Sequence, residues 1–441
     1  MSHTDRRIDE LLQIPVTSEL ALTPGQFLAS ARRIHGPIFR TVDYTGEKRL
    51  FVVGPEANRM VMVSEHARFS NYRGWNETDS VVRTLGRGMI FIDGPEHNRL
   101  RLAASSVFSE SGVAAWVPRM SEIIAARVSR WSDGSIIDLY EEAYSITFQL
   151  SAVLLIGLTD ELNIARLLTL FHELMSLNIR GLDDINAAAL VGRARRQQIS
   201  LEIAELIRPV IGRDLHSMSS ALSSLAAAGH CDGSPLSADE LVAHANTFLL
   251  AGHITTSSVC AFLLHQLATD EKNCDRVLME LRAINVSPRE IPFKALESMR
   301  GLDYTVKEAE RMFAPVPALP RGVIEDVVFG GFLIPKGQTL FCSIAGAHMS
   351  DDLFRDPGTF DPDRFAAPRA EHVKTPYSLV GFGAGPRRCL GQTMARTEIK
   401  LIVIHVLSRF ALEPLAECQA VPLYHPVLSP LHGLRVRLSA V

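Results

Sequence analysis

The residue in this sequence that could most directly do chemistry is Cys389, because of the residues around it. It lies in the stretch Phe382-Gly383-Ala384-Gly385-Pro386-Arg387-Arg388-Cys389-Leu390-Gly391. Glycine and proline allow a sharp backbone turn and a close approach to a flat object. Two arginines directly precede the thiol, and a helix is predicted to begin at about Gln392. Both features are expected to lower the pKa of Cys389 and to favour the metal-binding thiolate.

A single thiolate on a glycine-rich loop suits one axial position of a haem iron. No second cysteine lies nearby, so the loop does not suit tetrahedral zinc, which needs several ligands. A dinucleotide-binding loop is excluded, because Arg388 stands where a third glycine would be needed. The alternative is that Cys389 is a small buried apolar residue. That interpretation is kept for the other cysteines, which are Cys231, Cys260, Cys274, Cys342 and Cys418.

The pattern Phe-x-x-Gly-x-Arg-x-Cys-x-Gly resembles the haem-binding loop of the cytochrome P450 superfamily. Three further segments resemble motifs of this family and stand in the expected order. They are the distal oxygen-binding helix at 251–256, the Glu-x-x-Arg helix motif at 308–311 and the segment that follows it at 360–365. The resemblance extends from about residue 30 to the C-terminus. It implies a haem-thiolate oxidoreductase that carries haem b (heme b, iron protoporphyrin IX), with Cys389 as the ligand of the iron.

The fold implied by this resemblance is mainly α-helical with small β-sheets (α+β), the triangular fold of the family with a long central helix over the haem. We expect residues 1–30 to be an N-terminal lead-in and residues 31–441 to form one haem-thiolate catalytic domain. No linker or change of composition divides the chain, and its 47% of hydrophobic residues can form a large core. Strand-like runs at 39–42 and 50–53 predict a β-hairpin.

The sequence patterns of two regions give less information about the fold. Residues 70–92 are irregular in pattern and aromatic, and we expect either a cover over the substrate or an ordinary surface loop. Residues 115–225 are predicted to form amphipathic helices with short breaks, one of them at 181–185. By the resemblance, the stretch around 165–190 forms the roof of the substrate site.

Charge and terminal residues limit the possible partners. The net charge of −4 produces no basic field that would attract nucleic acid. The first residues lead into no long apolar run, so we expect no signal peptide, no membrane anchor and a cytoplasmic location. Six scattered cysteines form no disulfide framework. No fused flavin or iron–sulfur domain is visible, so we expect electrons to come from a separate donor such as ferredoxin with its reductase. We also expect the protein to be a monomer.

Several cationic residues are candidates for binding the haem. Pro95 is a good helix start, and His97 and Arg101 are four residues apart, so they share a helix face. A His/Arg pair can bind a propionate through charge-assisted hydrogen bonds. The resemblance implies this role, although a solvated charged face is the alternative. It also implies that Arg321 binds a propionate, and that Phe382, Arg387 and Gly391 contact the haem.

The segment from Ser237 onward predicts the long central helix. Ser237 and Glu240 form a capping box, and an apolar run continues to about Ala268, which gives roughly 45 Å of helix. Gly252 and the Ser/Thr cluster at 255–258 predict a local bulge in this helix. The alternative is a small-residue crossing between packed helices. By the resemblance, Ala251, Gly252 and above all Thr255 border the dioxygen site.

One position departs from the family. The residue before the conserved threonine is usually Asp or Glu, and here it is Ile254, which can neither carry a proton nor anchor a water. Proton delivery must then depend on Thr255, ordered water, another side chain or a substrate hydroxyl. His253 is adjacent, but it points about 100° away around the helix from Ile254, so we do not give it the acid's role.

Behind the haem, the resemblance implies a structural ion network. Glu308 and Arg311 are three residues apart and face the same way. The family adds Arg364 to this pair, in a buried network that holds the cysteine loop.

The remaining predicted site residues are those that would contact the substrate and the electron donor. By the resemblance, four residues border an apolar substrate pocket: Phe248, Val316, Ala318 and Leu319. Arg388, Arg396 and Lys400 could form a basic patch for an acidic electron donor, or simply a solvated helix face.

The residues and the resemblance together predict a haem-thiolate monooxygenase. It would oxidise a hydrophobic small molecule, by C–H hydroxylation or a related reaction in secondary metabolism, with O2 and external electrons. Ile254 keeps open an atypical outcome such as desaturation, cyclisation, C–C or C–N coupling, or a peroxide-driven reaction. A haem-based sensor is a third hypothesis, although no output domain is visible.

Overall fold

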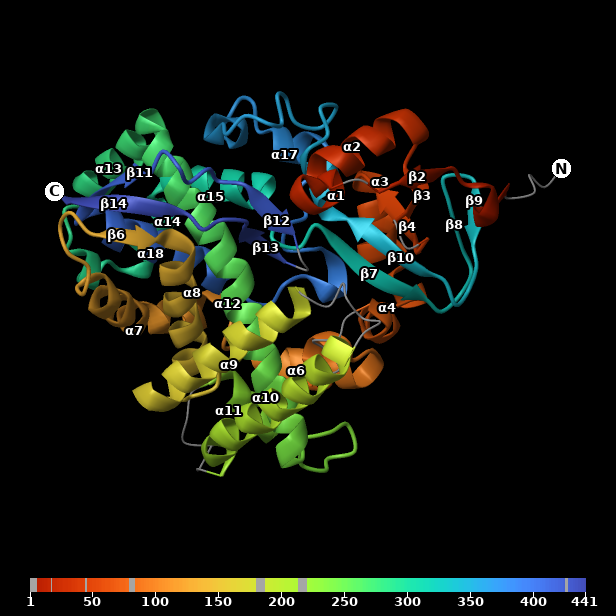
Figure 1. The fold of residues 1–441 in the computed structure, drawn as a ribbon, viewed down its shortest axis with the longest axis horizontal. Helices are drawn as coiled ribbons and strands as arrows, with labels where there is room; N and C mark the ends of the chain where they lie inside the picture. The colour runs from red at the N-terminus through yellow and green to blue at the C-terminus, as the bar shows by residue number, and fades with distance from the viewer. Residues whose placement is uncertain are drawn as a thin grey trace.

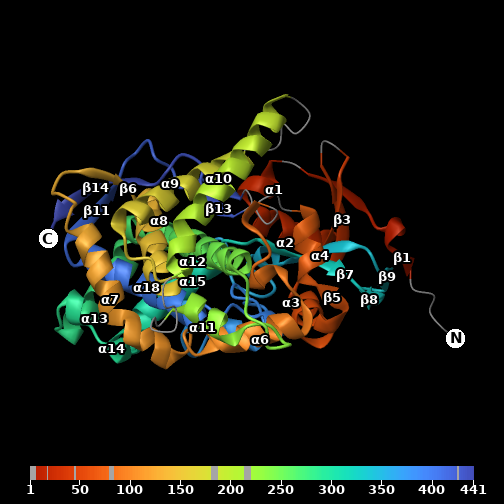
Figure 2. The same ribbon diagram turned by 90° about the horizontal axis from the view of Figure 1, so that it is seen from below.

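A long apolar helix, α12 (Ala238–Thr269), runs through the middle of the molecule and is surrounded by the other elements (Figure 1). Figure 2 shows the same helix nearly end-on at the centre of the protein. The computed structural model describes residues 6–16, 18–43, 46–78, 84–179, 187–212, 220–424 and 427–441, without the side chains at 76–78, 178–179 and 187–191. The predicted break at 181–185 lies outside the described residues.

The other helices surround α12 and differ widely in length. The longer ones are α2 (Pro24–His35), α6 (Gly94–Ser105), α7 (Glu110–Val128), α8 (Leu139–Leu150), α9 (Glu161–Ile179), α10 (Ala187–Ile211), α13 (Glu271–Ile284), α15 (Arg300–Met312) and α18 (Gln392–Leu407). The shorter ones are α1 (Glu19–Leu22), α3 (Pro55–Arg59), α4 (Asn71–Thr78), α11 (Ala221–Ala228), α14 (Phe293–Ser298), α16 (Ile344–His348) and α17 (Glu371–Lys374).

The strands gather into four small sheets. The largest has six strands in the order β2 (Gln13–Pro15), β3 (Ile38–Val42), β4 (Lys48–Val53), β10 (Thr339–Ser343), β7 (Ala318–Val323) and β5 (Phe69–Ser70). The others are β1 (Arg6–Arg7), β9 (Phe332–Ile334) and β8 (Val327–Phe329); β11 (Phe410–Pro414), β14 (Arg435–Ala440) and β6 (Ile136–Asp138); and β12 (Pro422–Tyr424) with β13 (Leu428–Pro430). The first two sheets lie at the N-terminal end of the molecule, at the right of Figure 1.

The predicted hairpin is confirmed, since β3 and β4 pair antiparallel with Phe39 opposite Phe51. The predicted lead-in takes part in these sheets, because β1 pairs with β9 and β2 pairs with β3. The division at residue 30 stays a prediction.

The expectation that residues 70–92 are irregular was wrong for their first part. Residues 71–78 form the helix α4, which packs closely on β7. A β-carbon at Gly74 would lie 2.7 Å from the backbone of Arg321, so a residue without a side chain permits this contact. The Trp75 ring meets the Phe91 ring edge-on at 6.1 Å. Aromatic packing and small residues therefore make a helix where the sequence pattern alone shows no clear period.

The start of α12 is the predicted capping box, in which Ser237 accepts from the Glu240 amide and Glu240 accepts from the Ser237 amide. The predicted bulge is absent, since Ala238–Thr269 is a continuous α-helix. Gly252 instead serves a close helix crossing, because a β-carbon there would lie 2.5 Å from Ser151 Oγ, just beyond the end of α8. Beside this contact, Thr147 of α8 donates to the His253 carbonyl at 3.2 Å.

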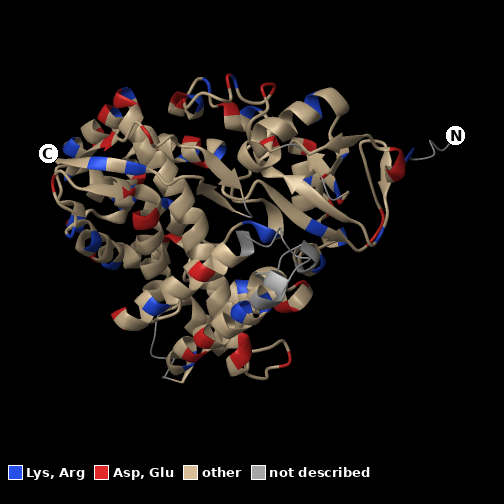
Figure 3. Cartoon of the chain, viewed as in Figure 1, with Lys and Arg blue, Asp and Glu red and all other residues tan. Residues whose placement is uncertain are grey.

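By length and composition, α12 could cross a membrane, but 78% of its most apolar window is buried inside the protein. A core helix satisfies the same test. Lys, Arg, Asp and Glu are interspersed over the rest of the chain in Figure 3.

Candidate active site around Cys389

The cysteine loop is a tight turn directly before α18. The Cys389 amide donates to the Phe382 carbonyl at 2.7 Å, and the Gly383 amide donates to the Val380 carbonyl at 2.7 Å. Gly385 has a φ of +64°, which favours glycine. A β-carbon there would also collide with the carbonyl of Met62. The glycine-rich sequence is therefore needed to fold the loop closely against its neighbours.

The Cys389 side chain is exposed, as are Gly385, Pro386 and Arg388 of the same loop. Burial raises its pKa above the ordinary thiol value, while a hydrogen bond from the Gly391 amide and the charges of Arg101 and Arg388 lower it. The two observations agree if the sulfur faces an open space that is enclosed by protein. The predicted net lowering of the pKa was wrong, because burial outweighs the nearby cations. A bound metal ion would supply the charge that deprotonates such a thiol.

Of the other cysteines, Cys260, Cys342 and Cys418 are buried as predicted, and Cys274 is half-buried. The same interpretation was wrong for Cys231, which is exposed.

Four residues that the sequence analysis assigned to the haem, three arginines and one histidine, form one electrostatic cluster beside this loop. Burial, followed by the charge of Arg387, lowers the pKa of His97 to about 4. Burial lowers the pKa of Arg321 to about 10, and it lowers the pKa values of Arg101 and Arg387 in the same direction. The residues come from α6, β7 and the cysteine loop, so only the tertiary fold brings them together.

The cationic cluster carries more positive charge than the described residues around it neutralise. Arg387 donates to Asp93 at 2.7 Å, whereas the hydrogen bonds from Arg101 and Arg321 go to the carbonyls of Arg388 and Pro320. Three guanidinium groups against one carboxylate leave two positive charges. The two propionates of haem carry two negative charges, so the donor set fits this cofactor. His97 would gain an acceptor in the same place.

In the middle of α12, two side chains on one face are accessible although most of their neighbours are buried. Ala251 is exposed, Thr255 is half-buried, and the two are four residues apart on the same face. Thr255 Oγ1 donates to the Ala251 carbonyl at 3.1 Å. Gly252 also lies in this segment, but the close approach of Ser151 explains its lack of a side chain.

A small cavity connects this part of α12 with the cysteine loop. Its volume is about 30 Å³, and its lining includes Thr255 and Thr256 of α12, Phe382 of the loop, Ala395 of α18 and Glu310 of α15. The Phe382 carbonyl accepts a hydrogen bond from the Cys389 amide. The cavity therefore places Thr255 next to the loop that carries Cys389.

The residues beside Thr255 carry no acid into this site. Ile254 is only 4% exposed and is apolar. The His253 ring points the other way, into a cage made by Tyr144, Phe148 and Phe171 at ring distances of 4.5, 5.0 and 5.9 Å. Burial lowers its pKa to about 3, so it is neutral. His253 therefore supports the packing of α12 on α8 and α9 and cannot replace the missing acid.

The predicted substrate-pocket residues lie in two places. Val316, Ala318 and Leu319 are half-buried at and before the start of β7. Phe248 is buried, and its ring packs against Phe108 at 6.2 Å. Their contact with a substrate stays a prediction.

The predicted ion network behind the loop forms with complete burial. Glu308, Arg311 and Arg364 are each 0% exposed. Glu308 accepts two hydrogen bonds from Arg311 at 2.8 Å and one from Arg364 at 2.9 Å. Backbone carbonyls of Pro357 and Thr359 take further donors from the two arginines.

Two acidic residues of these networks were missed by the sequence analysis. Glu371 accepts from Arg364 at 2.8 Å and completes the buried network. Asp93 accepts from the amides of Asn71 and Tyr72, at the start of α4, as well as from Arg387. Asp93 and Arg387 are 294 positions apart, so no local spacing could have indicated this pair.

The prediction of a basic patch on α18 was wrong for two of its three residues. Lys400 is 3% exposed and lies 3.2 Å from Asp303. Arg396 forms two hydrogen bonds to Glu310, at 2.8 and 2.7 Å. Only Arg388 is exposed, and it donates to Gln392. Helix periodicity predicts which residues share a face, but it does not show that acidic side chains cover this one.

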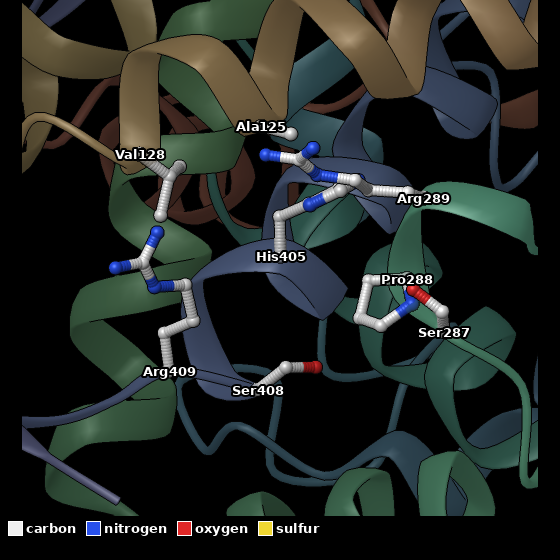
Figure 4. Close-up of a pocket in the computed structure, with 8 residues that line it drawn as sticks. All are labelled: Ala125, Val128, Ser287, Pro288, Arg289, His405, Ser408 and Arg409. Atoms are coloured by element: carbon white, nitrogen blue, oxygen red, sulfur yellow. The ribbon is translucent and has the colours of Figure 1, made fainter.

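Another cavity, of about 180 Å³, lies at the far end of α18 (Figure 4). It is lined by Ala125, Val128, Ser287, Pro288, Arg289, His405, Ser408 and Arg409. The end of α18 is about 24 Å along the helix from its start next to Cys389. Arg289 and Arg409 lie close to the carboxyl ends of α7 and α18, where cations offset the helix dipoles. The helix dipoles therefore explain why the two arginines lie here. The cavity is separate from the site at Cys389.

Comparison with known proteins agrees with this site. A sequence model of the family described as Cytochrome P450 matches residues 11–436. Cytochrome P450 26B1 of Mus musculus is 28% identical over 437 residues, which cover 96% of this chain and 84% of that protein. The structure titled "Retinoic acid bound cyanobacterial CYP120A1" has a TM-score of 0.83 and 26% identity, over 95% of both chains. The haem domain of cytochrome P450DA, at 20% identity and a TM-score of 0.83, supports the fold alone.

The chain therefore belongs to the cytochrome P450 family. The predicted fold class and the predicted oxidoreductase of the monooxygenase type are confirmed. The family implies haem as the cofactor, and it implies O2, a hydrophobic substrate and a redox partner. This result favours the enzyme over the haem-based sensor. The roles of the individual residues stay proposals.

The buried ion network yields a stability prediction. Arg311→Ala would leave Glu308 with an uncompensated buried charge and should lower the free energy of unfolding by about 3–5 kcal/mol. Haem content of the purified protein should fall to near zero, because the cysteine loop loses its support. Urea unfolding and the ratio of haem to protein absorbance measure the two effects. Arg119→Ala is the control, since Arg119 and Glu122 form an exposed pair that should contribute at most about 1 kcal/mol. Normal haem content in Arg311→Ala would contradict the role of the network.

Proposed function

We propose that this protein is a haem b monooxygenase in which Cys389 provides the thiolate ligand of the iron. The observation that carries the proposal is the exposed Cys389 side chain beside a cationic cluster with two uncompensated charges. His97, Arg101 and Arg321 would bind the propionates. Arg387 would do so while it stays paired with Asp93. The Gly391 amide would stabilise the thiolate by its hydrogen bond to the sulfur.

When bound, haem would supply the activation of dioxygen and the oxidation of an unactivated C–H bond. The protein's own contribution is position and proton control. Thr255 carries a hydroxyl on the open face of α12 and can donate from Oγ1 to an acceptor other than the Ala251 carbonyl after a rotation of its side chain. The 30 Å³ cavity beside it is large enough for a water, and Thr255 and Thr256 in its lining carry hydroxyls that such a water could bind. This water would give Thr255 a route to protons that needs no acid at position 254.

The substrate class follows from the apolar residues on the substrate side and from one relative. Phe248, Val316, Ala318 and Leu319 would border an apolar pocket. The cyanobacterial relative was solved with retinoic acid bound, and this supports an elongated apolar substrate for the present chain as well. The electron donor is proposed to be a ferredoxin with its reductase. We further propose that the protein is monomeric, lies in the cytoplasm and acts in secondary metabolism. These three points rest on the resemblance to bacterial members of the cytochrome P450 family.

A second candidate outcome is supported by the buried Ile254 in place of an acid. With a slower supply of protons, the same site could end the reaction in desaturation, cyclisation, C–C or C–N coupling, or use peroxide in place of O2. Strong turnover with hydrogen peroxide and no electron donor would favour this outcome over hydroxylation.

The ligand assignment has a direct test. Reduced wild-type protein exposed to carbon monoxide should show the red-shifted Soret band of sulfur-ligated haem, and Cys389→Ser should lose it, because a hydroxyl does not donate electron density as a thiolate does. Cys418→Ser is the matched control and should keep the band, since Cys418 is buried near β11 and β14, away from the loop. Absence of the band from haem-loaded wild-type protein would refute the proposal.

Substrate class can be tested by spectral titration. Elongated apolar molecules such as retinoic acid should shift the Soret band of the haem-loaded protein at micromolar concentrations, whereas small charged metabolites should not. Val316→Phe should weaken the shift by filling the pocket. A stronger response to polar metabolites than to apolar ones would contradict the proposed substrate class.

The departure at position 254 yields a further prediction. Ile254→Glu should raise the fraction of consumed electrons that appears in product, because it restores a proton donor beside Thr255. Ile254→Gln is the matched control. Gln resembles Glu in size and polarity but has no acidic proton, so this variant should give no gain. Product formed per NADPH consumed, in the presence of ferredoxin and its reductase, is the measurement. Equal coupling in both variants would show that the protons take a route that does not involve position 254.

A further inference from the structure

His348 is a fully buried histidine whose side chain lies between the ion network and the cysteine loop. It is the last residue of α16 and is 0% exposed. Its Nε2 accepts a hydrogen bond from the Val380 amide at 3.0 Å, and its Nδ1 lies 3.2 Å from the Arg311 carbonyl. Arg311 in turn donates from Nη1 to the carbonyl of His348 at 2.8 Å. The side chain and the backbone of His348 are therefore both tied to Arg311.

These contacts determine which nitrogen carries the proton. A backbone amide can only donate, so Nε2 must be the acceptor toward Val380. A carbonyl can only accept, so Nδ1 must carry the hydrogen and donate to Arg311. Burial, together with the charge of Arg311, lowers the pKa of His348 to about 3, so the ring stays neutral at physiological pH. A neutral ring with one donor and one acceptor satisfies both neighbours at once.

The bond to Val380 lies at the start of the cysteine loop. The Val380 carbonyl accepts from the Gly383 amide at 2.7 Å, and the Phe382 carbonyl accepts from the Cys389 amide at 2.7 Å. The ring also lies next to Gly381, since a β-carbon there would be in ordinary contact with His348 Cε1 at 3.5 Å. A short series of hydrogen bonds therefore leads from the buried Arg311 through His348 to the backbone that carries Cys389.

We infer that His348 is a positioning residue that transmits the rigidity of the Glu308–Arg311–Arg364 network to the cysteine loop and thereby sets where the Cys389 sulfur points. Its effect on the iron depends on the proposed function, because it assumes that Cys389 is the axial ligand. The hydrogen bond from Val380 to His348 does not depend on that assumption. The two parts can therefore be tested separately.

Two conservative substitutions separate the two hydrogen bonds of the ring. In Gln, the terminal amide is as many bonds from Cβ as Nε2 is in His, so His348→Gln can still accept from Val380. In Asn, the amide is as many bonds from Cβ as Nδ1, so His348→Asn can still donate to Arg311 but leaves the Val380 amide without its partner. Both replacements are neutral and polar. Because each variant keeps a different one of the two hydrogen bonds, the Val380 bond is read from the exchange of the Val380 amide itself.

The first measurement is hydrogen–deuterium exchange over residues 378–384, resolved to the Val380 amide. Exchange in His348→Asn should be about tenfold faster than in the wild type, and exchange in His348→Gln should remain close to it. The second measurement is the carbon monoxide spectrum of the reduced haem-loaded protein. His348→Asn should convert part of the thiolate-type Soret band to the band of a protonated or displaced sulfur, and His348→Gln should not.

His405→Ala is the control for loss of a buried histidine. His405 is 4% exposed and accepts or donates a hydrogen bond with Ser121 at 2.7 Å, at the far end of α18. It should lower overall stability without changing Val380 exchange or the Soret band. If His405→Ala changes both readouts as His348→Asn does, the effect is general destabilisation and the inference is overturned.

Equal Val380 exchange in His348→Asn and His348→Gln would also overturn the inference. If His348→Asn does not accumulate as folded protein, His348→Gln decides: protection of Val380 close to that of the wild type supports the inference, and exchange about tenfold faster overturns it. If haem-loaded wild-type protein shows no thiolate band, the proposed function fails, while the exchange data still decide whether His348 holds the loop.

Discussion

The buried salt bridges of Glu308 are the interaction on which the active-site region depends. Two guanidinium groups and a carboxylate with no exposure to solvent are tolerated only because nearly every donor has a partner, in Glu308, Glu371 or a backbone carbonyl. Such a network has one good geometry, so it holds the segments around 308–311 and 355–371 in one arrangement. The cysteine loop is built against that arrangement.

A second constraint is the shortage of negative charge near Cys389. Burial lowers the pKa values of Arg101, Arg321 and Arg387, and Asp93 is the carboxylate that the structure pairs with this cluster. Such a surplus is unfavourable for the protein alone and becomes favourable when an anionic ligand binds. Asp93 also holds the start of α4 through the amides of Asn71 and Tyr72. The position of α4, and of the substrate-side residues near it, is thereby coupled to the cationic cluster.

The central helix satisfies two requirements on different faces. Gly252 and the His253 ring pack against α8 and α9, while Ala251 and Thr255 look onto an open space. The helix can leave a polar hydroxyl in that space because its opposite faces are tightly held by apolar and aromatic contacts. An uninterrupted α-helix is therefore sufficient to place Thr255 near Phe382, and no bulge is needed.

The sequence alone determined the features that local rules control. Capping at Ser237, the hairpin of β3 and β4, and the spacing of Glu308 and Arg311 depend on neighbours nearby in the sequence, and the structure agrees with each. The resemblance supplied the family and a set of candidate residues. The tertiary structure decided the rest. The raised pKa of Cys389, the pairing of Lys400 with Asp303 and the bond of Arg387 to Asp93 involve burial and partners distant in the chain. Desolvation and long-range contacts are properties of the folded chain, so no periodicity or motif could have revealed them.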